Sequence, residues 1–143
     1  MSSTRVLGLD WGTKRIGIAI SDPSGAVAHG RESYRRRTLE EDVRFLKELV
    51  DRESVDEIVI GMPVRMRNVE GRQAKRVREF RSTLEENIQI PITVVDERLT
   101  SAEAERVLLE ADLSRGERKK KRDQLAATLI LQRYLNRPGS SES

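Results

Sequence analysis

Three carboxylates in this sequence, at Asp10, Glu97 and Asp123, stand where a folded chain could use them for chemistry. Asp10 and Glu97 each come at the end of a short apolar run, whereas Asp123 precedes Ala127 by one helical turn and so shares its face. Hard carboxylate oxygens bind Mg²⁺ or Mn²⁺, and acids that converge repel one another unless protons or cations compensate their charge. Each acid taken alone could simply stabilise a turn, a strand end or a helix. Only their combination points to a metal site.

The remaining residue types narrow the chemistry further. The chain has no cysteine and a single histidine, His29, so thiolate zinc sites, cysteine nucleophiles and disulfides are excluded. One imidazole cannot build a zinc site, and we interpret His29 as a structural or surface residue. Three convergent carboxylates would hold two Mg²⁺ or Mn²⁺ ions, which activate water and stabilise the leaving oxygen of a phosphodiester. Asp22 and Asp96 are candidates for supporting roles beside these acids, with turn stabilisation as the more ordinary alternative.

Basic residues gather in three clusters that suit a polyanionic partner. The chain of 143 residues carries 27 Lys+Arg against 24 Asp+Glu, a net charge of +3, so their distribution matters more than their sum. The clusters lie at residues 35–37, along residues 65–81, and at residues 115–122. Contacts between such clusters and phosphates release counterions, although the same charges could simply solvate helix faces. Aromatic residues make up 3% of the chain, which disfavours a surface on which bases stack.

The apolar pattern predicts an α/β fold. Short apolar or alternating runs predict strands at residues 6–10, 15–21, 26–34, 57–62 and 91–96. Helical spacing predicts helices over 39–53, about 74–84, about 104–111 and about 123–134. Three strands joined by turns, followed by alternating helices and strands, predict a mixed five-stranded sheet flanked by helices, with three antiparallel strands followed by parallel ones. Residues 64–71 should form a loop, and the basic segment around Gly116 should form a hinge before the last helix.

We expect a single domain over residues 1–137 and a disordered tail at 138–143. In sheets of this kind, ligands sit at the carboxyl ends of the parallel strands. Asp10 and Glu97 are predicted to lie at such ends. No segment resembles a signal peptide or approaches the roughly 20 apolar residues needed to cross a bilayer. We therefore expect a cytoplasmic protein with no membrane partner.

Four stretches of the sequence resemble the motifs of the YqgF (RuvX) family. The motifs follow the family order and cover the chain from about residue 5 to about residue 136, so the resemblance is specific. They lie at residues 8–17 with 21–22, at 60–63 with 70–71, at 96–100, and at 123–127 with 130–132. At Asn68 the family usually has glycine. Asn tolerates a left-handed backbone better than most residues, so the loop can keep its shape, but this departure bears on how the loop handles substrate.

The resemblance implies a ribonuclease-H-like fold related to that of Holliday junction resolvases. It also implies a metal-dependent nuclease, with maturation of the 5′ end of pre-16S rRNA in ribosome biogenesis as its main function. Carried over by position, its catalytic and metal-binding acids are Asp10, Glu97 and Asp123. The substrate contacts that we expect are Lys14, Arg15, Arg98 and Thr100.

Three other functions fit parts of the sequence. A Holliday junction resolvase would cut branched DNA with the same acids, and a homodimer would suit a four-way junction where a monomer would suit one RNA strand. A non-catalytic nucleic-acid-binding module would keep the fold and bind strands without a need for Mg²⁺. An actin-like ATPase lobe shares the Asp-x-Gly-Thr pattern of residues 10–13, but ATPases of that class need two lobes and 143 residues supply one.

Overall fold

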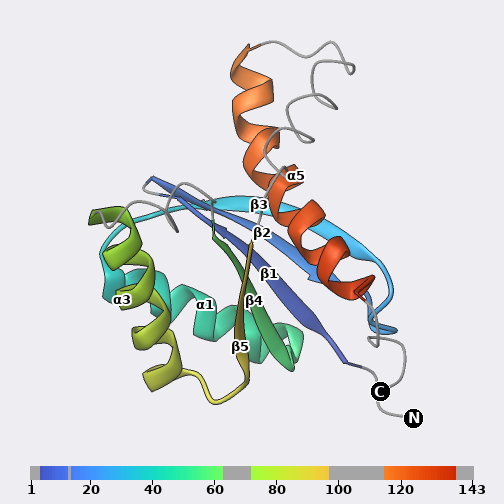
Figure 1. Cartoon of the computed structure of the whole chain (residues 1–143), viewed down its shortest axis with the longest axis horizontal. Helices are drawn as coiled ribbons and strands as arrows, with labels where there is room; N and C mark the ends of the chain where they lie inside the picture. Colours follow the sequence, from blue (N-terminus) through green and yellow to red (C-terminus); the bar gives the residue numbers. More distant parts are fainter. Residues whose placement is uncertain (1–3, 13, 63–71, 97–114, 138–143) are drawn as a thin grey trace.

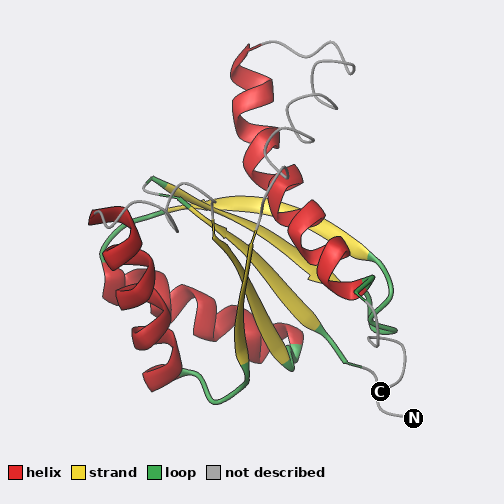
Figure 2. Ribbon diagram, in the orientation of Figure 1, coloured by secondary structure: helices red, strands yellow, loops and turns green. Residues whose placement is uncertain are grey.

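The computed structural model of the chain describes residues 4–12, 14–62, 72–96 and 115–137. A mixed five-stranded sheet lies between two helical layers (Figure 1). The strands are β1 (Val6–Trp11), β2 (Arg15–Ser21), β3 (Ala28–Arg35), β4 (Glu57–Met62) and β5 (Ile92–Asp96). The helices are α1 (Leu39–Glu53), α3 (Arg72–Asn87) and α5 (Arg115–Leu135). Helices α1 and α3 cover one face of the sheet, and α5 lies on the other (Figure 2).

The strand order is β3-β2-β1-β4-β5. Strand β2 pairs antiparallel with β1 and with β3, whereas β4 pairs parallel with β1 and with β5. This confirms the predicted sheet, with its antiparallel strands first and its parallel strands after them. Both helical connections step toward the β5 edge, and right-handed crossovers therefore place α1 and α3 on the same face.

Side chains alternate across β1 and separate a packed core from the opposite face. Leu7 and Leu9 point toward α1 and α3 and are fully buried in the larger of two hydrophobic clusters. Gly8 points toward α5, where an added Cβ would lie 2.7 Å from the Cβ of Leu131. Asp10 continues the Gly8 row, because alternate residues of a strand share a face. Helix α5 thus packs directly on the backbone that leads to Asp10.

Local sequence explains where α1 begins and ends. The Thr38 hydroxyl oxygen accepts a hydrogen bond from the backbone N–H of Glu41 at 3.1 Å, so Thr38 is the N-cap of the helix. The helix ends at Ser54, which adopts a left-handed conformation with φ 54°. Its bounds are those predicted from the spacing of apolar residues. The described helices include none that is long and apolar enough to span a membrane.

Helix α5 corrects one prediction. The expected hinge around Gly116 is wrong, because the helix already begins at Arg115 and Gly116 lies in its first turn. A glycine costs less there than in a helix interior, and the Glu, Lys and Arg residues around it are good helix formers. Asp123 consequently lies more than two turns inside the helix and not near its start. The predicted loop at 64–71, the helix at about 104–111 and the tail at 138–143 lie outside the described residues.

Candidate functional site

Asp10 lies near the carboxyl end of β1, in the middle of the sheet. It pairs with Gly17 on β2 and with Gly61 on β4. Since directly paired residues point to the same face, the half-buried Asp10 carboxylate has a glycine on either side. Neither glycine has a side chain to fill the space beside the carboxylate. No side chain of β2 or β4 at this level therefore blocks the approach of a cation or a phosphate to the Asp10 oxygens.

Helix α5 lies across the face of the sheet that carries Asp10 and runs roughly antiparallel to β3. Near the end of the helix, the Gln132 side chain accepts a hydrogen bond from the backbone N–H of Ala28 at 2.9 Å, where β3 begins. One to two turns earlier, the Thr128 and Gln124 side chains lie against Gly30. The N-terminal half of α5 thus extends in the direction in which β3 runs.

The same direction brings position 123 toward Asp10. Over β1, the Ala127 carbonyl oxygen and the Leu131 Cβ lie 3.4 Å and 2.7 Å from where a Cβ on Gly8 would be. Position 123 is one helical turn before Ala127, and Asp10 is two residues beyond Gly8. Strands β1 and β3 run in the same direction and α5 runs opposite to both. The step from Ala127 back to residue 123 along α5 and the step from Gly8 on to Asp10 along β1 therefore point in the same direction. The structure therefore places the backbone of residue 123 on the Asp10 side of this contact.

Three predicted site residues, Glu97, Arg98 and Thr100, lie outside the described residues. The strand before them, β5, ends at Asp96, whose side chain is likewise outside the description. Val95, one residue earlier, packs in the smaller hydrophobic cluster under α5. Among the described residues, no three His, Cys, Asp or Glu side chains are grouped so that they could hold a metal ion. The convergence of the three acids thus stays a prediction.

Two of the expected phosphate contacts lie near Asp10. Arg15 begins β2 two residues before Gly17, which is the partner of Asp10. The side chain next to it, Ile16, is buried in the larger cluster under α1 and α3, so Arg15 points to the opposite face, that of Asp10. Diagonal neighbours of this kind have backbones about 7–8 Å apart. Lys14, in the turn between β1 and β2, is exposed.

A buried ion pair that the sequence did not reveal holds the hairpin between β1 and β2. Asp42, in the first turn of α1, is fully buried and accepts hydrogen bonds from Arg36 Nε at 3.0 Å and from the Arg37 backbone N–H at 2.8 Å. Arg36 also donates to the Gly12 carbonyl at 3.3 Å, and its guanidinium lies 4.7 Å above the centre of the Trp11 ring. An acid in a first helical turn usually only complements the helix dipole, so the sequence carried no signal of this second role.

Tyr34 belongs to the same buried group. Burial first, and then the hydrogen bond to Asp42 and the negative charge of that acid, raise the pKa of Tyr34 to about 12. Its ring stacks on Phe45 with 4.1 Å between the ring centres. At neutral pH the Tyr34 hydroxyl is therefore protonated and is a hydrogen-bond donor to Asp42.

Asp22 stabilises the turn before β3. Its carboxylate accepts hydrogen bonds from the backbone N–H groups of Val27 and Ala26 and from the Ser24 hydroxyl, which lower its pKa. These bonds hold residues 26 and 27 in the turn, so β3 begins at Ala28 and not at residue 26 as predicted. The interpretation of Asp22 as a turn residue is supported.

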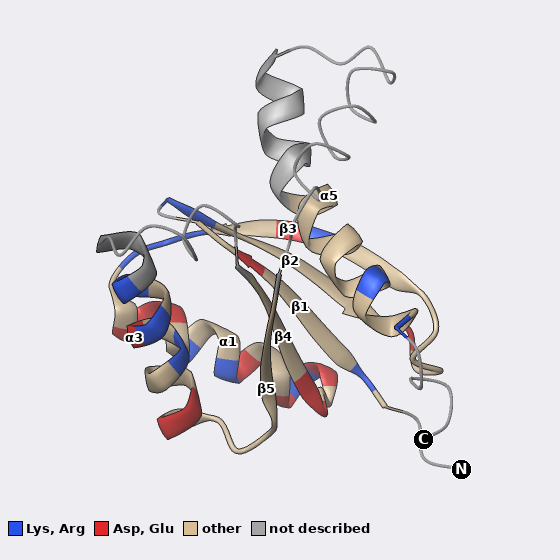
Figure 3. Ribbon diagram, in the orientation of Figure 1, with Lys and Arg blue, Asp and Glu red and all other residues tan. Residues whose placement is uncertain are grey.

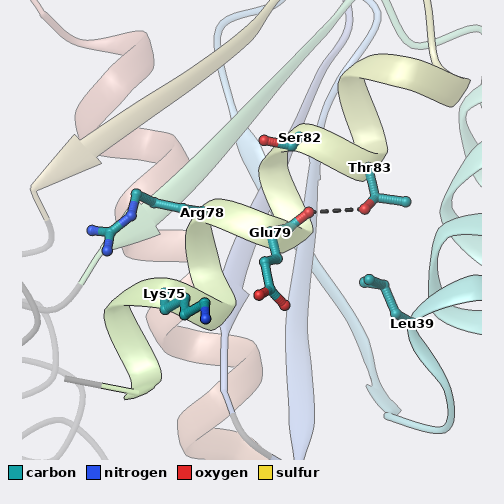
Figure 4. Close-up of a pocket in the computed structure, with 6 residues that line it drawn as sticks. All are labelled: Leu39, Lys75, Arg78, Glu79, Ser82 and Thr83. Carbon is teal, nitrogen blue, oxygen red and sulfur yellow. Dashed lines mark hydrogen bonds between the residues drawn. The ribbon is translucent and has the colours of Figure 1, made fainter.

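The basic clusters occupy different parts of the structure. Figure 3 shows basic positions at the end where β2 and β3 meet, and along α3. A shallow pocket of about 450 Å³ lies between α1 and α3, on the face opposite to Asp10 (Figure 4). Its lining residues are Leu39, Lys75, Arg78, Glu79, Ser82 and Thr83. Because it is separated from Asp10 by the sheet, this pocket is not part of the candidate site. His29 is exposed on the edge strand β3, as predicted.

Comparison with known proteins gives a consistent result. The model of the family described as "RuvX: Holliday junction resolvase" matches residues 4–137. A protein of Moorella thermoacetica is 51% identical over 137 residues, which are 96% of this chain and 98% of that protein. One of Clostridium acetobutylicum is 50% identical over 132 residues, 92% of this chain and 98% of that protein. Both bear the name "Putative pre-16S rRNA nuclease".

Solved structures show the same fold. RuvC of Thermus thermophilus in complex with a Holliday junction has a TM-score of 0.58 at 14% identity, over 96% of this chain and 97% of that one. The fowlpox virus resolvase in complex with Holliday junction DNA has a TM-score of 0.55 at 13% identity, over 94% of this chain and 100% of that one. The predicted ribonuclease-H-like fold is confirmed.

Proposed function

The chain belongs to the RuvX family, and we propose that it is a nuclease that hydrolyses a phosphodiester of pre-16S rRNA to mature its 5′ end. Relatives that are named for this reaction share about half of their residues with the chain over almost its whole length. The observation that carries the proposal is the position of Asp10, half-buried near the carboxyl end of β1 between two paired glycines.

We infer that Asp10, Glu97 and Asp123 hold two Mg²⁺ or Mn²⁺ ions. The donors fit such ions, because they are carboxylate oxygens in a chain without cysteine whose one histidine is exposed on an edge strand. The backbone of residue 123 lies toward Asp10, and Glu97 follows Val95, a residue of the α5 face, by two positions in the sequence. When bound, the ions would activate water and stabilise the charge on the scissile phosphate.

Side chains around Asp10 would bind the nucleic-acid backbone. Arg15 points to the face of Asp10 and Lys14 is exposed next to it, so both can hold the nucleic-acid backbone by charge and hydrogen bonds. Arg98 and Thr100 follow Glu97 in the sequence, and we propose that they contact the same strand. Contacts of this kind position a strand without reading its bases.

Branched DNA is the second candidate substrate. The description of the matching family model favours a Holliday junction, whereas the names of the relatives favour rRNA. A homodimer would suit the two-fold symmetry of a junction, and a monomer would suit a single RNA strand. The molecular mass in solution therefore bears on the choice between these substrates.

One assay separates the candidate functions. The purified protein is mixed with a 5′-extended 16S rRNA fragment or with a four-way DNA junction, in Mg²⁺, in Mn²⁺, or with a chelator. We expect metal-dependent cleavage that is faster on the RNA. Cleavage of the junction alone would favour the resolvase. Strand binding that is indifferent to Mg²⁺, with no cleavage of either substrate, would favour the non-catalytic module. Tight ATP binding without cleavage would favour the actin-like lobe.

A further inference from the structure

Two arginines stand directly opposite each other next to the candidate site. Arg15 on β2 pairs with Arg35 on β3, and the adjacent pair is Ile16 with Tyr34. Ile16 and Tyr34 pack in the larger hydrophobic cluster under α1 and α3. The two arginines therefore point to the other face, which also carries Asp10. Like charges directly opposite each other on paired strands repel, so this pair needs an explanation.

No acid among the described residues neutralises this pair. In the part of the chain that the structure describes, neither Arg15 nor Arg35 forms an ion pair. The two arginines that follow Arg35 are different. Arg36 binds the buried Asp42 at 3.0 Å. The Arg37 guanidinium lies 3.9 Å from a carboxylate oxygen of Glu41, four residues later in the chain. In the basic run at residues 35–37, Arg36 and Arg37 thus have acidic partners, whereas Arg35 has none within the described ranges.

The backbone that carries the two arginines is well held. The N–H of Arg36 donates to the Lys14 carbonyl at 2.9 Å, which joins the residues beside the pair. The Arg36 side chain adds bonds to Asp42 and to the Gly12 carbonyl. Neighbouring strands are about 4.8 Å apart, so the two guanidinium groups can approach one anion together. Such a rigid frame lowers the entropy lost when the anion binds.

We propose that Arg15 and Arg35 together form a phosphate-binding site for the nucleic-acid backbone, next to the phosphodiester at Asp10. The inference rests on the proposed function and deepens it. A phosphate accepts paired hydrogen bonds from both guanidinium groups, and its charge removes their repulsion. The site starts at Arg15, the diagonal neighbour of Asp10, and extends one strand farther to Arg35, so it holds a phosphate that flanks the bond to be cut. Because the contact is to phosphate, RNA and DNA are held alike.

The test measures strand binding without cleavage. In protein that carries Asp10→Asn, Arg15→Gln and Arg35→Gln are made singly and together, and a labelled single-stranded RNA is titrated over a series of salt concentrations. The matched control is Arg31→Gln, on the same strand, because Arg31 is ion-paired with Glu53 at 3.2 Å. Each single variant of the pair should bind about tenfold more weakly. The slope of log affinity against log salt should fall by about 0.7, and the control should keep the parent values.

The double variant and a second nucleic acid sharpen the result. If the two arginines hold one phosphate, the double variant loses much less than the product of the two single losses. The losses should be the same on single-stranded DNA. Without nucleic acid, Arg35→Gln should not lower the Tm, because it removes a repulsion, whereas a structural role for Arg35 would lower it.

Several outcomes would overturn the site. The first is an RNA affinity and salt slope of Arg35→Gln equal to those of Arg31→Gln. The second is a loss of affinity in the double variant equal to the product of the two single losses. The others are a loss of affinity for RNA but not for DNA, and a lower Tm for Arg35→Gln. The proposed function fails separately, if the unmutated protein binds RNA through this pair but cuts no strand with any divalent metal.

Discussion

Gly8→Ala should destabilise the protein and disturb the site at the same time. The added Cβ would meet the Leu131 Cβ at 2.7 Å and the Ala127 carbonyl oxygen at 3.4 Å. Both atoms are fixed to the α5 backbone and cannot rotate away, so the helix itself must move off β1. Overpacking of this kind costs about 2 kcal/mol. Unfolding entropy near 2.1 cal/mol/K per residue, over 143 residues, converts that cost to a Tm lower by about 7 °C.

The matched control for this prediction is Gly30→Ala, under the same helix. There the added Cβ would meet the Gln124 Cγ and Nε2 and the Thr128 hydroxyl at 2.7–2.8 Å. All three are side-chain atoms beyond Cβ, which bond rotation can move without a shift of the helix. Its cost should stay within about 1 kcal/mol. Thermal unfolding and the rate of strand cleavage are measured for both variants.

Because α5 carries Asp123, Gly8→Ala should also slow cleavage by more than the unfolded fraction explains. Equal Tm values for the two variants would refute the direct packing of α5 on β1. A destabilised Gly8→Ala protein with full activity would refute the coupling of that contact to the site.

Further predictions concern the buried group at the hairpin. Asp42→Asn leaves Arg36, whose side chain is only 16% exposed, without its counter-charge and should cost about 3 kcal/mol in denaturant unfolding. Glu53→Gln, at partly exposed ion pairs, should cost under about 1 kcal/mol. Equal costs would contradict the role of Asp42. The pKa of Tyr34 is raised to about 12 in the folded protein from about 10 in the unfolded chain, so its contribution to stability is complete below pH 10 and is lost as the pH rises toward 12. Tyrosinate absorbance in Tyr134→Phe protein measures this directly, and a folded-state midpoint near pH 10 would contradict it.

The sheet could be predicted from the sequence because its strands carry strong patterns. The apolar run from Glu57 to Met62 and the alternation in β2 are independent of distant contacts. Thr38, a good N-cap residue, likewise marks the start of α1. The strand register and the packing of α5 on the Asp10 face depend on contacts between segments far apart in the chain. No local pattern could show that Gly17 and Gly61 flank Asp10.

The basic residues show the same limit. Residues 35–37 form one cluster in the sequence, yet strand alternation sends Arg36 to the core face and Arg35 to the Asp10 face. The partner of Arg36 is an acid six residues away that looks like an ordinary helix-start residue. At Gly116, a glycine among charged residues indicated a hinge, but the strong helix formers around it outweighed the cost of one glycine. Ion-pair partners and helix boundaries of this kind depend on tertiary contacts, which cannot be read from the local sequence.

We propose that the Asp10 carboxylate is required for metal-dependent cleavage and not for strand binding. The most direct test compares unmutated protein with Asp10→Asn on a 5′-extended 16S rRNA fragment, with Mg²⁺ or Mn²⁺ present, and measures cleavage and binding in parallel. We expect Asp10→Asn to abolish cleavage while its affinity for the RNA, measured in chelator, stays within about twofold of the parent, because Asn fills the same space. Undiminished cleavage by Asp10→Asn would contradict this role of the Asp10 carboxylate.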